Sequence, residues 1–231
     1  MSAGERRRLA ILFDIDGTLI ISGGAGAASW RLAFDDLYGI PADIGAFTDT
    51  GMTDPEVGRK TFEAVLHRDP EGAEFATLLE RRLFHLRQTV AASEAYRVLD
   101  GVAELLPDLI AKGYLLGLVT GNLEAAAHIK LHRGTLNRYF AFGGYGSDSS
   151  DRAEVTRTAL RRASLVYGEE LDPGRCLVVG DTPHDADAAH AAGVACVGVA
   201  SHTFDAEQLR ASKADWVIES LAVGLPEAAL G

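Results

Sequence analysis

Cysteine is scarce in this chain, since Cys176 and Cys196 are the two cysteines among its 231 residues. Two thiols in a chain of this length cannot supply the disulfide framework that stabilises many small secreted proteins. Both cysteines fall in short apolar runs that predict β-strands. We therefore expect two buried core thiols and no structural disulfide.

Long hydrophobic runs are also absent. The charged segment Glu5–Arg8 precedes apolar residues, but that apolar run extends only from Leu9 to Phe13 before Asp14 interrupts it. A membrane-spanning helix needs about 20 apolar residues, and the apolar part of a signal peptide about 7–15. The sequence therefore predicts neither a membrane span nor a secretory signal, and we expect a cytoplasmic location.

Positive charge is in short supply, with 22 lysines and arginines against 33 aspartates and glutamates and a net charge of −11. An acidic surface disfavours nucleic acids and anionic membranes as partners, but it allows a local positive pocket for a small phosphorylated metabolite. The length permits one large domain, or a core with a small second one. We expect a monomer or a homodimer.

The most informative stretch is Asp14-Ile15-Asp16-Gly17-Thr18-Leu19, which follows the apolar run directly. In open parallel α/β sheets, ligands bind beyond the carboxyl ends of the strands, and a carboxylate there can act as a nucleophile or hold a cation. Gly17 and Thr18 favour a tight turn, which keeps both carboxylates near one cleft. We predict that Asp14 is a nucleophile.

Three later segments supply partners for these carboxylates. The strand-like run 115–119 ends in Thr120-Gly121-Asn122, which delivers a hydroxyl and unhindered N–H groups suited to a phosphate. The run 176–179 ends in a segment with Asp181 and Asp185, so that a hard divalent cation becomes plausible. Between them, Arg152 opens a helical stretch and could pair with phosphate oxygens.

Strand and helix patterns alternate along the chain, which predicts an α/β fold with a doubly wound parallel sheet. Strands are expected near Leu9, Leu115, Phe140, Cys176 and Ala195, and helices over 102–111, 123–132, 152–167 and 183–192. The segment 22–97 is too long for an ordinary crossover and has helical patterning over 27–37 and 75–90. We expect a helical cap domain at 22–97, inserted after the first strand into a Rossmann-like core made of 1–21 and 98–231.

Taken together, these motifs resemble the haloacid dehalogenase superfamily, most closely its phosphoglycolate-phosphatase-like branch. Its phosphatases carry an aspartate-x-aspartate-glycine-threonine loop, a threonine or serine after the second strand, a basic residue and a final acidic loop, in this order. The basic residue is usually lysine. No lysine lies between Lys130 and Lys213 in this chain, so Arg152 is the match.

The resemblance implies a Mg2+-dependent hydrolysis of phosphate monoesters through an aspartyl-phosphate. Asp14 would attack phosphorus, and Mg2+ would be held by Asp14, the backbone carbonyl of Asp16 and Asp181. Asp16 would act as acid and then base, and crowded neighbouring carboxylates would help keep it protonated at first. Thr120, Gly121 and Arg152 would bind the phosphoryl oxygens. Asp185 is a possible outer-sphere residue of the metal site.

Ordinary structural roles compete with these assignments. A strand followed by a turn and a helix cap at Asn122 would give the same sequence pattern. Asp181 and Asp185 could simply cap and charge the first turn of a helix. Arg152 precedes further arginines on what could be a solvated helix, and a surface position is favoured for His184. In the cap, Thr48–Asp54 resembles a substrate-facing loop, but Thr53 or Asp54 could instead cap the next helix. No cluster of basic residues for a multiply charged substrate is evident in the cap.

Three other functions remain open. A dehalogenase of the same superfamily would need neither Asp16 as an acid nor a metal at Asp181. A phosphomutase would retain Asp16 and transfer phosphate between positions of a sugar. A receiver-like signalling module also pairs aspartates with Mg2+ on a doubly wound sheet, but the large insertion disfavours it. Phosphoglycolate as the substrate follows from the resemblance alone.

Overall fold

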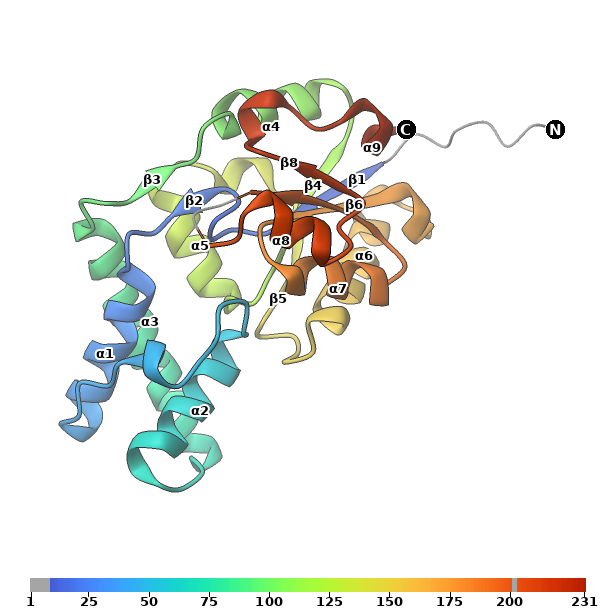
Figure 1. Cartoon of the computed structure of the whole chain (residues 1–231). Coiled ribbons are helices and arrows are strands. Elements are labelled where there is room, and N and C mark those ends of the chain that lie inside the picture. The colour runs from blue at the N-terminus through green and yellow to red at the C-terminus, as the bar shows by residue number, and fades with distance from the viewer. Residues whose placement is uncertain (1–8, 201–202) are drawn as a thin grey trace.

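The computed structural model describes residues 9–200 and 203–231. A six-stranded parallel sheet in the order β5-β4-β1-β6-β7-β8 forms its centre (Figure 1). The strands are β1 (Ala10–Phe13), β4 (Leu115–Thr120), β5 (Phe142–Tyr145), β6 (Cys176–Gly180), β7 (Ala195–Val199) and β8 (Trp216–Ile218). Since β1 lies between β4 and β6, the carboxyl ends of these three strands meet at one edge of the sheet.

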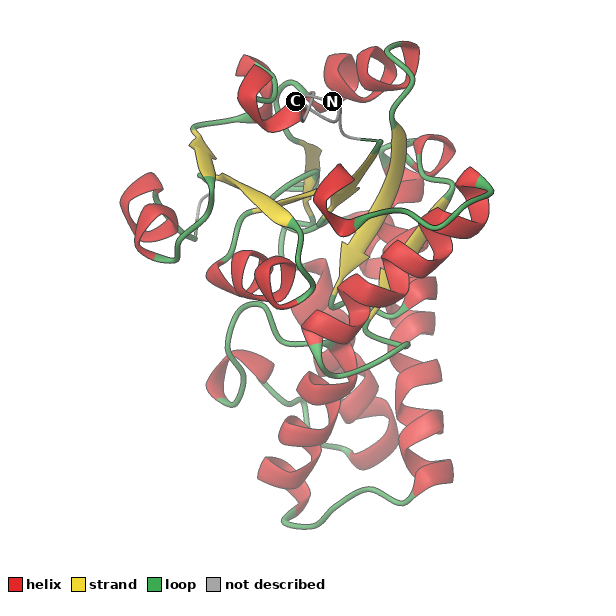
Figure 2. Ribbon diagram, turned by 90° about the vertical axis from the view of Figure 1, so that its right-hand side faces the viewer, coloured by secondary structure: helices red, strands yellow, loops and turns green. Residues whose placement is uncertain are grey.

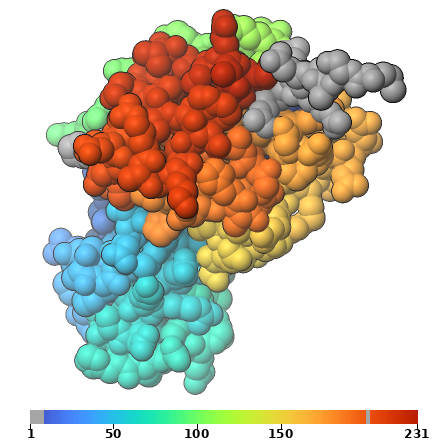
Figure 3. All heavy atoms as spheres, turned by 45° about the vertical axis from the view of Figure 1, so that its right-hand side comes forward, coloured from blue at the N-terminus to red at the C-terminus, as the bar shows by residue number. Residues whose placement is uncertain are grey.

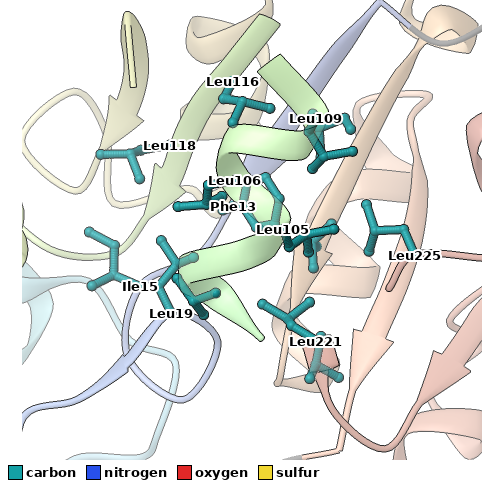
Figure 4. Close-up of a cluster of buried hydrophobic side chains, with 14 of the residues drawn as sticks. Phe13, Ile15, Leu19, Leu105, Leu106, Leu109, Leu116, Leu118, Leu221 and Leu225 are labelled. Carbon is teal, nitrogen blue, oxygen red and sulfur yellow. The ribbon is translucent and has the colours of Figure 1, made fainter. Parts of the chain in front are cut away.

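The sheet is covered by helices on both faces because its central strands are apolar on both sides. Ile11 and Phe13 face one hydrophobic cluster together with helix α4 (Val102–Ala111) and helix α5 (Glu124–Arg133). Figure 4 shows Phe13 in this cluster together with Leu105, Leu106 and Leu109 of α4. Ala10 and Leu12 face a second cluster, which includes residues of α6 (Arg152–Tyr167) and α7 (Pro183–Ala191). The predicted doubly wound sheet is confirmed.

Both cysteines are buried in this core, Cys176 in β6 and Cys196 in β7. Strand β8 was not expected from the sequence, because it has only three residues. The remaining elements of the core are short helices: η2 (Asn137–Tyr139), η3 (Pro173–Arg175), α8 (Ala206–Ala211), η4 (Leu221–Val223) and α9 (Glu227–Leu230). Among the described residues, no helix is long and apolar enough to cross a membrane.

A helical layer lies below the sheet in Figure 2. It connects β2 (Ile20–Ile21) to β3 (Arg97–Val98), two strands that pair antiparallel, and consists of α1 (Ala25–Tyr38), η1 (Ile44–Ala46), α2 (Asp54–Leu66) and α3 (Gly72–Ala92). The helical patterns over 27–37 and 75–90 lie within α1 and α3. The layer has its own apolar cluster around Trp30, Phe34 and Phe62, and α3 also packs against α5 through Leu86 and Ala126.

Helix α6 approaches β5 so closely that Gly144 leaves no room for a side chain. A Cβ at Gly144 would lie 2.1 Å from the carbonyl oxygen of Val155. Overpacking of this kind costs about 1–3 kcal/mol. Gly144→Ala should lower the free energy of unfolding by that amount in chemical denaturation. Gly72→Ala is the control, because a Cβ there has nothing within 4 Å; equal stability of the two variants would contradict this packing.

Candidate active site

Asp14 and Asp16 lie directly beyond the carboxyl end of β1. The N–H of Asp14 donates to the carbonyl of Val179 in β6 over 2.9 Å, which continues the sheet hydrogen bonding to the first carboxylate. The Asp14 side chain is 10% exposed, whereas the Asp16 side chain is 37% exposed. The two carboxylates therefore occupy different surroundings although they are two residues apart.

Asp14 follows β1, Asp181 follows β6, and Asp185 lies in the first turn of α7. One carboxylate oxygen of each lies within 4.8 Å of the others. Burial raises the pKa of Asp14 well above its ordinary value, and the Asp185 and Asp181 charges add to this, while Arg152 opposes it. A buried group of carboxylates whose ionisation is opposed in this way fits a hard divalent cation such as Mg2+, which takes oxygen ligands.

Asp185 already has donors on both of its oxygens. Its Oδ1 accepts from the Arg152 guanidinium, and its Oδ2 accepts from the N–H and the hydroxyl of Thr182 over 3.0 and 2.8 Å. Thr182 is the N-cap of α7, and Asp185 completes its capping box. Asp185 is thus both a helix-start carboxylate and a member of the acidic group.

Gly17 allows the β1 loop to approach Asp181. Its backbone has φ of +88°, and a Cβ at this position would lie 2.1 Å from Oδ2 of Asp181. The buried Thr18 hydroxyl then donates to Oδ1 of Asp181 over 3.3 Å. The glycine and threonine of the motif therefore bring the first and last acidic segments together.

Thr120, Gly121 and Asn122 lie at the carboxyl end of β4, as predicted, and all three line the same cavity as Asp14. The suggested capping role of Asn122 is wrong, because Leu123 is the N-cap residue of α5. The Asn122 amide instead donates to Oδ2 of Asp16 and to the Thr120 hydroxyl, both over 2.9 Å. Asn122 thus connects the loop after β4 to Asp16.

Lys130 is a site residue that sequence reasoning missed. It lies on α5, is 5% exposed, and donates to Oδ2 of Asp16 and to Oδ1 of Asn122, each over 2.6 Å. A signal existed, since Lys130 stands among the buried Ala126, Ala127 and Leu131 of its helix. A lysine on the apolar face of a helix needs a buried partner, and here that partner is 114 residues away.

The pKa of Asp16 is lowered in this arrangement. Burial works to raise it, but the charge and hydrogen bond of Lys130, together with the Asn122 amide, outweigh burial. The expectation that crowded carboxylates keep Asp16 protonated is therefore wrong for this geometry. The carboxylates of Asp181 and Asp185 lie close to that of Asp14. Asp16 instead accepts hydrogen bonds from Lys130 and from the Asn122 amide.

Arg152 lies at the start of α6 with its side chain directed into the site and only 14% exposed, so it is not on a solvated face. It pairs with Asp185 and lies 4.0 Å from Oδ1 of Asp14. His184, in contrast, is exposed and lies beside Gly51 of the helical layer, where a Cβ would be 2.5 Å from its ring. Figure 3 shows the helical layer, blue to cyan, lying against the orange surface of the core.

A cavity of about 460 Å³ lies between the sheet edge and the helical layer. Its lining from the core includes Asp14, Asp16, Thr120, Lys130 and Arg152, and its lining from the helical layer includes Trp30, Asp54 and Arg82. Residues 48–52, which belong to the segment predicted to face the substrate, also line it. All residues predicted to bind phosphate therefore line one side of the cavity, and residues of the helical layer line the other.

Asp54 connects the two parts and is not a cap residue. Thr53 is the N-cap of α2, with Glu56 completing its capping box. The Asp54 N–H donates to the carbonyl of Gly121 over 2.7 Å, and its carboxylate accepts from the N–H of Leu123 over 2.8 Å and from Arg82 over 2.9 Å. The helical layer is therefore fixed directly to the loop after β4.

Gly17→Ala should weaken divalent-metal binding, because its Cβ would displace the Asp181 carboxylate. Gly39→Ala is the matched control, since Gly39 also has a positive φ, of +69°, but nothing within 4 Å of a Cβ. Both variants carry the backbone strain of a positive φ, and only Gly17→Ala should lose Mg2+ affinity in calorimetric titration. Equal Mg2+ affinities of the two variants would show that metal binding does not need the close approach of Gly17 to Asp181.

Lys130→Met should raise the pKa of Asp16, because the burial that works to raise it remains while the ammonium is removed. A carbon-13 NMR titration of the Asp16 carboxyl in metal-free protein measures this shift. His132→Gln, an exposed change on the same helix, should leave the pKa unchanged. An unaltered Asp16 pKa in Lys130→Met would exclude Lys130 as the cause.

Comparison with known proteins identifies the family of this chain. A family model described as haloacid dehalogenase-like hydrolase matches residues 9–193. A 5'-nucleotidase of Pseudomonas aeruginosa is 30% identical over 218 residues, which cover 87% of this chain and 86% of that protein. A phosphoglycolate phosphatase of Salmonella paratyphi A is 27% identical over 238 residues, covering 94% of this chain and 92% of that protein.

The crystal structure of a predicted phosphoglycolate phosphatase from Haemophilus somnus has the same fold, with a TM-score of 0.72 at 23% identity, over 95% of this chain and 97% of that one. The resemblance stated from the sequence motifs is therefore confirmed. The chain belongs to the haloacid dehalogenase-like hydrolase family and resembles its phosphatases.

Proposed function

We propose that this enzyme hydrolyses small phosphate monoesters with Mg2+ through an aspartyl-phosphate at Asp14. The observation that carries the proposal is the position of Asp14. It lies at the carboxyl end of the central strand, within the acidic group formed with Asp181 and Asp185 and 4.0 Å from the Arg152 guanidinium. One carboxylate thus faces both a site for a cation and a donor for phosphate oxygens.

Asp14, Asp181 and the backbone carbonyl of Asp16 are the groups proposed to hold the metal. When bound, Mg2+ supplies positive charge that offsets the repulsion between the Asp14 carboxylate and a phosphate dianion. Its charge also favours ionised Asp14, opposing the burial and the neighbouring carboxylates that raise the pKa of this residue. An ionised Asp14 is the form required for attack.

In the first step an Asp14 oxygen forms a bond to phosphorus, and the bond between phosphorus and the ester oxygen breaks. Asp16, when protonated, gives its proton to that oxygen. In the second step a water oxygen attacks phosphorus, the Asp14–phosphorus bond breaks, and Asp16 takes a proton from the water. The contact with Lys130 favours ionised Asp16 and therefore suits the second step.

Thr120, the Gly121 N–H and Arg152 are proposed to bind the phosphoryl oxygens. They line the cavity beside Asp14, and donors fixed where charge accumulates usually make the largest contribution to catalysis. Arg152 takes the place of the usual lysine of the family, with a planar guanidinium that can offer two parallel hydrogen bonds.

Residues 22–97 are proposed to act as a cap domain over a catalytic core of 1–21 and 98–231. Support comes from the separate apolar cluster of the helical layer and from its position along one wall of the cavity. A cap in this place excludes water and selects the group attached to the phosphate. The substrate is accordingly expected to be a small phosphorylated metabolite.

Phosphate release from a panel of phosphorylated metabolites, with and without Mg2+, tests the proposal. Asp14→Asn should lose at least about 1,000-fold in kcat because the nucleophile is removed. Asp185→Asn should weaken rate or metal affinity more modestly, since it retains one acceptor oxygen. Asp187→Asn is the control, as Asp187 is exposed on the same helix.

Metal-dependent release that is lost in Asp14→Asn would support the phosphatase. An Asp14→Asn variant as active as the wild type would overturn the mechanism. Transfer of phosphate within a sugar, with no free phosphate, would identify a mutase of the same family.

A further inference from the structure

Arg82 is a buried cation that the proposed chemistry does not use. It lies on α3 within the apolar series Phe75, Leu78, Arg82, Leu86 and Val90, and it is 1% exposed. Its guanidinium carbon lies 5.2 Å from the ring centre of Trp30, and both residues line the cavity that contains Asp14. An arginine at a core position of a helix needs a specific partner.

Asp54 satisfies only one of the three guanidinium nitrogens. Nη2 of Arg82 donates to Oδ1 of Asp54 over 2.9 Å. Nε and Nη1 are buried, and neither has a hydrogen-bond partner among the described residues. A buried donor without a partner is costly, so two on one side chain at a cavity wall indicate that a ligand supplies the acceptors.

The position of this guanidinium is fixed relative to the reaction centre. Asp54, which holds it, is itself bound to the N–H of Leu123 and to the carbonyl of Gly121. The charge of Arg82 also contributes, after Lys130 and Asn122, to lowering the pKa of Asp16. A ligand bound by Arg82 would thus lie at a set distance from the loop proposed to bind phosphate.

The other cations at the cavity have partners in the core, although Nε of Arg152 is also buried without one. Lys130 binds Asp16 and Asn122, and Arg152 binds Asp185 beside Asp14. Asp43 and Asp49 add negative charge, but both are exposed. Arg82 is therefore the cation lining the cavity, within the described residues, that has two unpartnered nitrogens.

We propose that Arg82 binds a second anionic group, a carboxylate or a phosphate, on the substrate. The preferred substrates are then phosphate monoesters with a second negative charge near the scissile phosphate, small enough for a cavity of about 460 Å³. This inference rests on the proposed function, because it assigns the transferring phosphate to Asp14 and Arg152.

The test is equilibrium binding to the Asp14→Asn variant with Mg2+ present, measured by calorimetry so that no turnover occurs. Two pairs of esters isolate the second charge: phosphoglycolate against ethyl phosphate, and 3-phosphoglycerate against glycerol 3-phosphate. At least one anionic member should bind about tenfold or more tighter than its partner, the range of a charge-assisted hydrogen bond.

Arg82→Gln, added to Asp14→Asn, should abolish this preference while leaving the affinity for the partner esters nearly unchanged. Arg82→Lys should retain part of the preference because it retains the charge. Arg81→Gln is the matched control, since the Arg81 side chain is 42% exposed on the same helix. Thermal unfolding of each variant verifies that it is folded, and Arg82→Lys serves as the test if Arg82→Gln does not fold.

Each result has a defined meaning. A preference lost in Arg82→Gln and kept in Arg81→Gln supports the subsite. Equal binding of the esters with and without the second negative charge, or a preference that survives Arg82→Gln, overturns it and leaves Arg82 as a structural partner of Asp54. Phosphate release by the wild type is measured separately, so a subsite that binds without turnover is distinguished from failure of the proposed phosphatase.

Discussion

The repulsion among Asp14, Asp181 and Asp185 is the constraint on which the rest of the site depends. Three buried carboxylates with oxygens within 4.8 Å of one another disfavour the ionised state unless positive charge compensates them. Arg152 offsets part of this, through Asp185 and at 4.0 Å from Asp14. The remaining negative charge is what makes the group suited to a divalent cation.

The backbone is shaped so that these charges can meet. Gly17 leaves space for the Asp181 carboxylate, and Gly180 does the same for Asp185, whose Cβ would lie 2.5 Å from a Cβ at that glycine. The parallel register of β1 with β6 then places both acidic segments at one edge of the sheet. What distinguishes this site from an ordinary acidic surface is the close approach of the loop after β1 to the segment after β6. The number of acidic residues alone would not produce such a group.

Beside the acidic group, the site contains Asp16 with its partners and the residues of the helical layer that line the cavity. Lys130 and Asn122 hold Asp16 apart from the acidic group and favour its ionised form. Asp54 fixes the helical layer to the loop after β4, and it also holds Arg82 at the cavity wall. Asp16 and Arg82 are thus both attached to the loop after β4, Asp16 through Asn122 and Arg82 through Asp54.

Residues next to strand ends could be predicted from the sequence, because strand, turn and carboxylate are contiguous there. Asp14, Thr120 and Asp181 all occur where the apolar pattern stops. Lys130 and Arg82 were missed because their partners are 114 and 28 residues away. Asn122 was assigned a local capping role because its actual partner, Asp16, belongs to another strand end. Distant pairing of this kind is set by the fold and leaves only a weak local signal.

Direct detection of phosphate on Asp14 tests the central claim most plainly. The protein is mixed with a substrate that it hydrolyses, quenched in acid within the first turnover, and digested for mass spectrometry. The account predicts a phosphorylated peptide with the modification at Asp14, absent from Asp14→Asn. Turnover without any phosphorylated aspartate, or with phosphate on Asp16 or Asp181, would contradict it.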